Sequence, residues 1–170
     1  MSTVRITSGI YKNAKLQVPP SAHPTGERER IAIFNSLGDA IKNACVLDAF
    51  AGSGSLGLES LSRGATSADF LDNDREAKRV IAENAKRLGV WEETAYFAGN
   101  LPNQYDIIFA DPPYDNPQLQ VVEKLLNFLC PSGLLVLSLS RTLPTPTFPG
   151  LTQLSDKTYA RARILIYQKD

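Results

Sequence analysis

The sequence places hydrogen-bond acceptors beside an aromatic ring, where they could hold an amino group. Residues 111–114 read Asp-Pro-Pro-Tyr and directly follow a strongly apolar stretch, 105–110. Because proline has no N–H, this turn presents carbonyl oxygens and the Asp111 carboxylate, and Tyr114 adds a stacking surface. That combination suits the exocyclic amine of a flat base, held by its protons and stacked on the ring. Taken alone, the same residues could simply be a proline turn that ends a strand.

A glycine-rich segment, 48–57, follows another apolar stretch. Its glycines, Gly52, Gly54 and Gly57, permit a tight strand-to-helix turn and a close approach of the backbone to a ligand. The acid before them, Asp48, would repel a pyrophosphate and suits an ammonium group or a hydroxyl donor. This chemistry favours S-adenosylmethionine, whose methionine end carries an amine, over NAD. A glycine loop that binds no ligand is the alternative.

A third acidic group lies 20 residues after Gly52, where Asp72, Asn73 and Asp74 follow the next apolar stretch. An acid at this position can accept hydrogen bonds from both hydroxyls of a ribose. Asp74 could instead cap the helix that follows. We therefore assign the ribose to Asp72 and the helix cap to Asp74.

The elements that must position these groups alternate between strands and helices from residue 44 onward. Strands are expected at 45–50, 67–71, 94–97, 105–110, 133–139, 151–154 and 162–167, and helices at 27–37, 56–63, 74–88 and 118–129. This order predicts a doubly wound α/β sheet. Such sheets bind ligands at the carboxyl ends of their strands, where all three acidic groups lie.

The N-terminal residues form a separate unit in this interpretation. Residues 1–20 are expected to be a β-hairpin arm that ends at two prolines, and residues 21–170 the main domain. Thr25 is expected to cap the helix 27–37. The buried face of that helix would carry three apolar side chains at helical spacing, Ile31, Phe34 and Leu37.

Composition narrows the class of protein further. The chain has 170 residues, 43% of them hydrophobic, which predicts one globular domain with a small appendage. It has one histidine and two cysteines, so a multi-histidine metal site, a cysteine-rich zinc site and a disulfide scaffold are excluded, and no metal is expected. It has no signal peptide and no apolar run of about 18 residues. We therefore expect a cytoplasmic protein without membrane contact.

In combination, these features resemble class I S-adenosylmethionine-dependent amino-methyltransferases. Four segments, 6–16, 23–35, 48–59 and 159–163, resemble the RsmD family, whose members methylate N2 of a guanine in bacterial 16S ribosomal RNA. The resemblance covers nearly the whole chain. It implies a Rossmann-like, doubly wound, seven-stranded sheet with an N-terminal β-hairpin extension. It also implies a monomer that uses S-adenosylmethionine and acts on ribosomal RNA within the small subunit or its assembly intermediate.

The resemblance and the motifs together assign roles to individual residues. Catalysis is expected from Asp111, Pro112 and Tyr114. The residues expected to bind the cofactor are Thr25, Arg28, Asp48, Phe50, Ala51, Gly52, Ser53, Gly54, Leu56, Asp72, Asn73, Asn100 and Leu101. The residues expected to contact RNA are Arg5, Tyr11, Lys12 and Lys15. Formal net charge is +0, which is unusual for an RNA enzyme, but residues 1–30 carry more basic than acidic groups. A solvated edge that only pads the sheet is the alternative for the hairpin.

The chain departs from the family pattern at several positions. His23, Gly26, Ile31, Asn100 and Ser138 stand where the family usually has arginine, threonine, glutamate, aspartate and glutamate. The segment 100–104 is also short, so we expect the helix after the third strand to be lost. Three other functions stay open. They are an N6-adenine methyltransferase acting on DNA, a methyltransferase acting on a protein amide, and an RNA-binding assembly factor that has lost catalysis.

Overall fold

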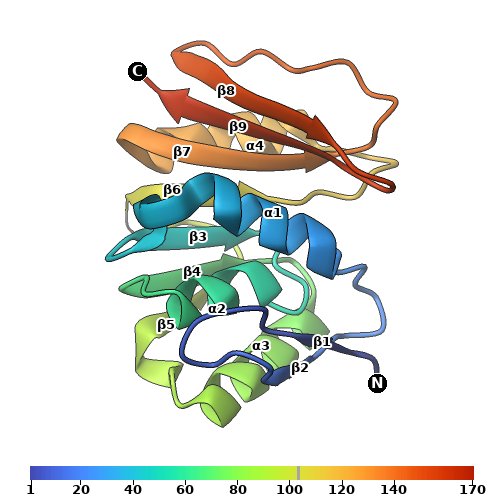
Figure 1. The fold of residues 1–170 in the computed structure, drawn as a ribbon, viewed down its shortest axis with the longest axis vertical. Coiled ribbons are helices and arrows are strands. Elements are labelled where there is room, and N and C mark those ends of the chain that lie inside the picture. Colours follow the sequence, from blue (N-terminus) through green and yellow to red (C-terminus); the bar gives the residue numbers. More distant parts are fainter. Residues whose placement is uncertain (103) are drawn as a thin grey trace.

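The fold is built on a seven-stranded sheet with the strand order β5-β4-β3-β6-β7-β9-β8 (Figure 1). The computed structural model describes residues 1–102 and 104–170. The strands are β3 (Cys45–Ala49), β4 (Ser67–Leu71), β5 (Thr94–Phe97), β6 (Tyr105–Ala110), β7 (Leu129–Leu139), β8 (Leu151–Thr158) and β9 (Arg163–Lys169). Strands β3 to β7 are parallel, and β9 runs antiparallel between β7 and β8. The predicted seven-stranded, doubly wound sheet is confirmed.

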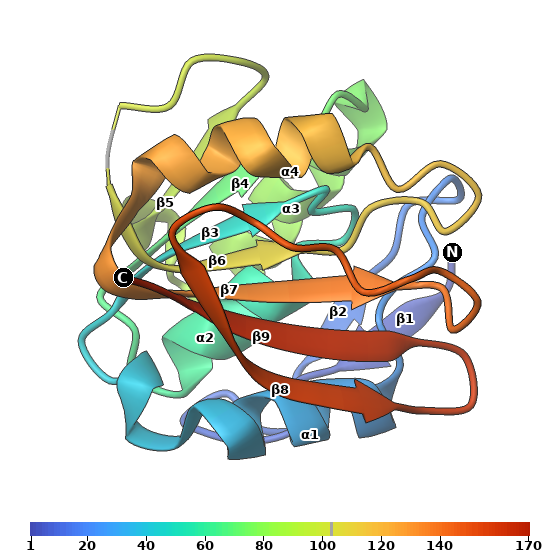
Figure 2. The ribbon, with the colours of Figure 1, turned by 90° about the horizontal axis from the view of Figure 1, so that it is seen from above.

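Helices cover both faces of this sheet. They are α1 (Glu27–Leu37), α2 (Ser55–Ser62), α3 (Arg75–Leu88) and α4 (Leu119–Leu125), with 3-10 turns η1 (Gly38–Ile41), η2 (Trp91–Glu93) and η3 (Leu126–Phe128). Figure 2 shows α1 and α4 on opposite faces. Apolar residues of α1, α2 and α3 form one buried cluster with alternate residues of the strands, and α4 forms the other. This alternation is why Val46 and Leu47, adjacent in β3, are both fully buried.

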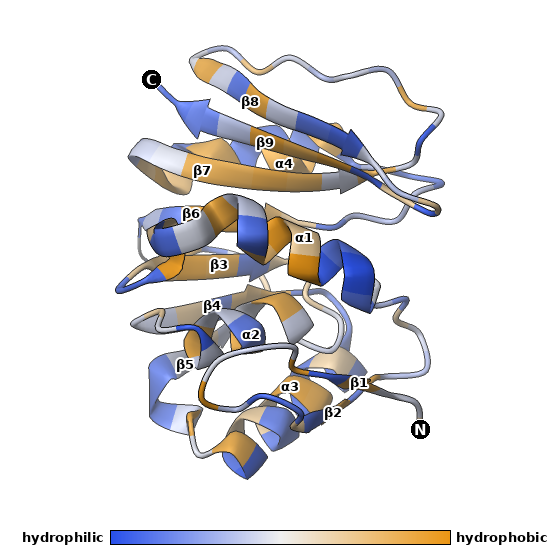
Figure 3. Cartoon of the chain, viewed as in Figure 1, coloured by the Kyte–Doolittle hydropathy of each residue, from blue (hydrophilic) through white to orange (hydrophobic). Residues whose placement is uncertain are grey.

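The N-terminal hairpin packs against the helices and does not join the central sheet. Its strands, β1 (Thr3–Arg5) and β2 (Lys15–Gln17), pair antiparallel with each other. Ile6 and Leu16 are buried in the same apolar cluster as α1, α2 and α3. Figure 3 shows how apolar residues are concentrated toward the sheet and polar ones on the outer surfaces of the helices. The extension is therefore part of the protein's packed core on that face.

A buried ion-pair cluster joins the N-terminal segment to two helices. Glu59 in α2 is 0% exposed and Arg30 in α1 is 1% exposed, and Arg30 Nε lies 3.5 Å from Glu59 Oε2. Glu59 Oε1 also accepts from the backbone N–H of Thr7 at 2.9 Å and from Arg63 Nη2 at 3.2 Å. Burial lowers the pKa of Arg30, and the opposite charge of Glu59 opposes that shift. Each of these two buried charges is therefore stabilised by the opposite charge of the other.

Two expectations about helices were wrong in detail: which residue of α1 faces inward, and how long α4 is. Ile31 is 38% exposed, because Arg30 takes the inward position on α1 beside Ile33 and Phe34. The expected helix 118–129 is shorter, because Gln118 has a positive φ of 46° before α4 and Leu129 already pairs with Tyr105 as the start of β7.

The expectation that Thr25 caps α1 was also wrong. Gly26 takes the cap position without a side-chain hydrogen bond. The hydroxyl of Thr25 contacts the acidic tetrapeptide instead, as described below.

Two further expectations concern helices. Between β5 and β6, the described residues contain no helix, as the short segment 100–104 predicted, and residue 103 lies outside the described part. Within the described residues, no helix combines the length and the apolar composition needed to cross a membrane.

Replacing Glu59 with glutamine should destabilise the protein strongly. The variant leaves the Arg30 guanidinium buried without an opposite charge, a change that typically costs about 3–5 kcal/mol. Denaturant unfolding followed by circular dichroism measures this difference. Glu123→Gln is the matched control, because Glu123 is exposed on α4 and should change stability by less than about 0.5 kcal/mol. Equal unfolding midpoints for the two variants would show that the buried cluster does not stabilise the fold.

Candidate active site

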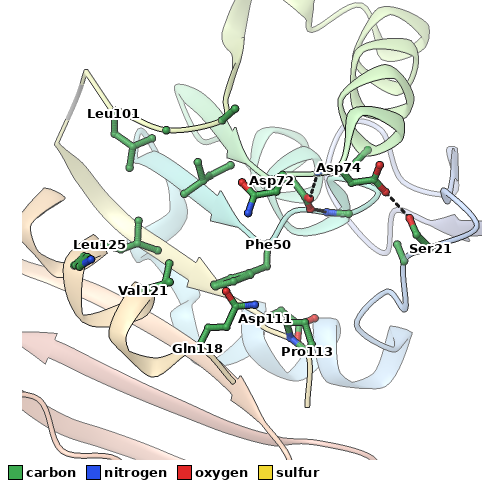
Figure 4. A pocket seen from close by; sticks show the side chains of 18 of the residues that line it. Ser21, Phe50, Asp72, Asp74, Leu101, Asp111, Pro113, Gln118, Val121 and Leu125 are labelled. Atoms are coloured by element: carbon green, nitrogen blue, oxygen red, sulfur yellow. Dashed lines mark hydrogen bonds between the residues drawn. The ribbon is translucent and has the colours of Figure 1, made fainter. Parts of the chain in front are cut away.

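A cavity of about 650 Å³ opens at the carboxyl ends of β3, β4 and β6 (Figure 4). This is the edge where parallel α/β sheets bind ligands. Seven of the residues expected to bind the cofactor or to act in catalysis line it. They are Phe50, Gly52, Asp72, Asn73, Asn100, Leu101 and Asp111. The cavity therefore lies at the edge of the sheet where the sequence placed the ligand site, and these seven residues are part of its lining.

A second, much smaller cavity adjoins the first. Phe50, Gly52 and Asp111 line both cavities, so the two share a wall. Further expected residues line only the small cavity, and they are Thr25, Asp48, Ala51, Ser53 and Leu56. The Oγ atom of Ser53 is buried there without a hydrogen-bond partner among the described residues. Because buried hydroxyl groups are normally hydrogen-bonded, this orphaned group indicates a place for a polar ligand atom.

Four of the expected site residues line neither cavity. Arg28 lies exposed on the first turn of α1, so the structure gives it no contact with the proposed cofactor site. Gly54, with φ of 76°, shapes the turn into α2, and its missing Cβ avoids Phe70. Pro112 is buried, and Tyr114 lies just outside at 38% exposure.

The glycine loop is held in place by two carboxylates. Asp48 Oδ2 accepts from the backbone N–H of Gly57 at 2.9 Å, and Asp72 Oδ2 accepts from that of Gly52 at 2.9 Å. The second oxygen of Asp72 accepts from the N–H of Asp74, and Asp74 caps α3 as expected. Each carboxylate oxygen can accept two hydrogen bonds, so Asp72 can still accept from a ribose.

Burial makes both central carboxyl groups harder to ionise. Burial raises the pKa of Asp48 well above its ordinary value, and the nearby Asp111 and Asp72 raise it further, against the hydrogen bond from Gly57. Burial likewise raises the pKa of Asp111, and hydrogen bonds from Thr25 and Ser138 oppose this. A cationic ligand would relieve this repulsion. The site's electrostatics therefore suit a positively charged molecule.

The Asp-Pro-Pro-Tyr turn is positioned by two hydroxyl groups that sequence reasoning did not assign to this role. Thr25 Oγ1 donates to Asp111 Oδ2 at 2.6 Å, which ties the segment before α1 to the end of β6. Ser138, near the end of β7, hydrogen-bonds to Asp111 and lies 3.0 Å from the hydroxyl of Tyr114. Ser138 was noticeable in the sequence only as a departure from the family pattern.

One wall of the large cavity was not predicted at all. It is supplied by Gln118, by α4 and by η3, and its residues are Gln118, Val121, Lys124, Leu125 and Phe128. Only the spacing of apolar residues along α4 could have indicated this wall. His23 also lines this cavity.

Two of the hairpin residues expected to contact RNA, Tyr11 and Lys12, lie away from this cavity. The backbone N–H of Tyr11 donates to Ser62 Oγ at 3.0 Å, at the last residue of α2. Since α2 begins beside the glycine loop and runs back along the sheet, Tyr11 and Lys12 lie toward the opposite edge (Figure 1). Arg5 pairs with Glu27 at 3.3 Å on the surface. RNA contact by the hairpin stays a prediction.

The strand order, the glycine loop and the cavity at the carboxyl edge define a Rossmann-like class I methyltransferase fold. The solved structure of the Escherichia coli candidate methyltransferase yhhF matches with a TM-score of 0.88 at 30% identity, covering 99% of each chain. A hypothetical protein of Thermus thermophilus matches with a TM-score of 0.79 at 28% identity, covering 96% of this chain and 98% of that one.

Sequence comparison identifies the family. The family model described as Conserved hypothetical protein 95 matches residues 4–168. Ribosomal RNA small subunit methyltransferase D of Haemophilus influenzae is 32% identical, covering 97% of this chain and 93% of that protein. The protein of the same name from Escherichia coli K12 is 31% identical, covering 98% and 90%. The chain belongs to this family, the RsmD family.

Replacing Asp48 with asparagine should stabilise the ligand-free protein. The amide oxygen can still accept from Gly57, while the buried charge disappears. At pH 8 we expect the free energy of unfolding to rise by about 1 kcal/mol. Because the pKa of Asp48 is raised in the fold, its charge destabilises above that pKa, and the gain should shrink as pH falls through it.

Urea unfolding at several pH values measures this gain. Asp115→Asn, at an exposed position after the tetrapeptide, is the control and should change nothing. An Asp48→Asn protein that is less stable than wild type at pH 8 would contradict the electrostatic account.

Proposed function

We propose that this protein transfers a methyl group from S-adenosylmethionine to the exocyclic N2 amine of a guanine in 16S ribosomal RNA. The observation that carries the proposal is Asp111, whose carboxylate lines both cavities and is held by Thr25 at 2.6 Å. The relatives named ribosomal RNA small subunit methyltransferase D support ribosomal RNA as the substrate class. We further propose a monomer that acts in the cytoplasm on the small subunit or its assembly intermediate.

The residues present fit S-adenosylmethionine. Asp48 and the orphaned Ser53 hydroxyl, in the small cavity that adjoins the large one, would contact a polar atom of the methionine end, and Asp72 would receive the ribose. Asn100 and Leu101 would lie beside the adenine in the large cavity. When bound, the cofactor supplies an electrophilic methyl group on a positively charged sulfur. Since burial raises the pKa of both Asp48 and Asp111, a cation beside them would stabilise their ionised forms.

The chain's own residues would then orient the attacking amine. Guanine N2 is a poor nucleophile, because its lone pair is delocalised into the ring. Hydrogen bonds from the amine to the Asp111 carboxylate and the Pro112 carbonyl would turn that lone pair toward the methyl group, with Tyr114 stacked on the base. On accepting the methyl group from the sulfonium, which would leave as a thioether, N2 would gain positive charge, and Asp111 would stabilise that charge. The proton that N2 loses passes to Asp111 or to water.

Replacing Asp111 with alanine should abolish most methyl transfer and leave cofactor binding largely intact. The loss of a group that stabilises developing charge typically costs about 10²–10³ in rate. Unmethylated small ribosomal subunits are the substrate, nucleoside mass spectrometry identifies the product, and calorimetry measures cofactor affinity. Asp39→Ala, on the exposed η1 turn, is the matched control. N2-methylguanosine made by wild type but not by Asp111→Ala supports the proposal. No methyl transfer to the subunits or to naked 16S RNA by a wild type that still binds the cofactor would contradict it and favour the DNA alternative.

Replacing Ser138 with alanine should move the acid limb of the pH–rate profile to higher pH. A hydroxyl that donates to the ionised carboxylate lowers the pKa of Asp111, so its loss raises that pKa. Since the reaction needs ionised Asp111, activity is lost at a higher pH than in wild type. Ser138→Thr should restore the profile, and Ser36→Ala, exposed on α1, should not alter it. An equal loss at every pH would indicate a purely structural role for Ser138.

A further inference from the structure

Exposed arginines from three separate segments gather at the same edge of the sheet as the cavities. Arg28 lies on the first turn of α1, Arg141 follows the end of β7, and Arg161 lies in the turn between β8 and β9. Strands β7 and β8 both end at this edge, and α1 begins there (Figures 1 and 2). We call Arg28, Arg141 and Arg161 the basic rim.

Contacts connect the basic rim to the proposed catalytic turn. Thr25, three residues before Arg28, donates to Asp111. On the other flank, Tyr114 hydrogen-bonds Ser138, three residues before Arg141. Arg141 Nη1 in turn donates to the carbonyl of Ala160 at 3.3 Å, which fixes the neighbouring turn that carries Arg161. The segments that carry the basic rim are therefore linked to the turn that holds Asp111 and Tyr114.

The charges of the basic rim are available to a ligand. Among the described residues, Arg28 and Arg161 form no ion pair, and the contact of Arg141 with a carbonyl leaves its charge uncompensated. Nearby Arg163 differs, because it is already paired with Asp156. The acids near the basic rim include Glu29, which acts on Tyr114, and Asp115, which follows Tyr114 in the chain. Glu27, next to Arg28, is already paired with Arg5. Arginines that lack an ion pair among the described residues thus border an acidic interior.

This arrangement separates the two parts of a nucleotide by charge. Phosphates would be repelled by Asp111 and Asp48 inside the cavities and attracted by the arginines outside. A neutral base turned out of its stack can enter while its backbone stays on the surface. Phosphate contacts of this kind set position and orientation without reading sequence.

We propose that the basic rim binds the RNA backbone on either side of the target nucleotide and so presents the base to Asp111. This inference rests on the proposed function. It assigns backbone binding to residues at the cavity mouth, whereas the hairpin residues Tyr11 and Lys12 lie at the far end of α2. Arg28, which the sequence assigned to the cofactor, becomes an RNA-binding residue.

The test is a neutralised triple variant, Arg28→Gln/Arg141→Gln/Arg161→Gln. Fluorescence anisotropy measures its binding to a labelled 16S ribosomal RNA transcript across a series of salt concentrations. Each lost contact with a phosphate of single-stranded RNA reduces the slope of the log binding constant against log salt concentration by about 0.7. The loss of three contacts should therefore reduce the slope by about 2. Near physiological salt, affinity should fall by at least about tenfold, while affinity for S-adenosylmethionine stays unchanged.

Two matched triples make the result specific. Lys42→Gln/Lys86→Gln/Arg87→Gln removes the same charge at exposed positions near the opposite edge and should leave RNA affinity within about twofold of wild type. Arg5→Gln/Lys12→Gln/Lys15→Gln tests the hairpin. If the hairpin triple weakens RNA binding and the basic-rim triple does not, the proposal is overturned in favour of the hairpin. Equal losses in all three triples would also overturn it, since they would show only a general charge effect.

Failure of this inference can be distinguished from failure of the proposed function. Methylation of small subunits by wild type, with unchanged RNA binding and RNA KM in the basic-rim triple, overturns the basic rim alone. An absence of any RNA methylation by wild type that still binds S-adenosylmethionine overturns the proposed function. If wild type methylates no RNA and also does not bind the transcript, the proposal that the basic rim binds RNA is overturned as well.

Discussion

The buried carboxylate of Glu59 is the interaction on which the geometry of the site depends. It accepts from Thr7 and pairs with Arg30, so it fixes both ends of the N-terminal segment that runs between them. That segment contributes Ser21, Ala22 and His23 to the large cavity and Thr25 to the small one. Glu59 lies in α2, the helix that follows the glycine loop. One buried ion pair therefore holds the N-terminal segment and the glycine loop in place relative to each other.

The sheet itself explains why acidic side chains converge at one edge. Asp48 is in register with Phe70 on β4 and with Phe109 on β6, and Asp72 and Asp111 each follow two residues later. Three neighbouring parallel strands therefore deliver three carboxyl groups to one place. Burial and mutual repulsion raise the pKa of Asp48, so its ionised form is disfavoured in the ligand-free site and would be stabilised by a cationic cofactor. A formal net charge of +0 for the whole chain conceals this separation between acidic interior and basic border.

Local pattern and sheet topology account for what the sequence could predict. Residues 67–71, 94–97 and 105–110 were expected as strands and are strands. The first and last have apolar residues buried in the sheet, whereas β5 is a half-buried edge strand. The position of the acidic groups followed from the rule that places ligands at carboxyl strand ends. The outward position of Arg28 and the inward position of Arg30 could not be predicted in this way. Both depend on the rotation of α1 about its axis, in which Arg30 meets the distant Glu59 beside the buried Ile33 and Phe34.

The same limit applies to Ser138, which sequence reasoning could read only as a departure from the family pattern. In the structure its hydroxyl contacts both Asp111 and Tyr114. A glutamate here would add a negative charge beside a carboxyl group whose pKa burial already raises, whereas a hydroxyl can donate to that carboxylate and oppose the shift. Serine at this position is therefore compatible with an ionised Asp111, and it links the orientation of Tyr114 to the group that would receive the amine.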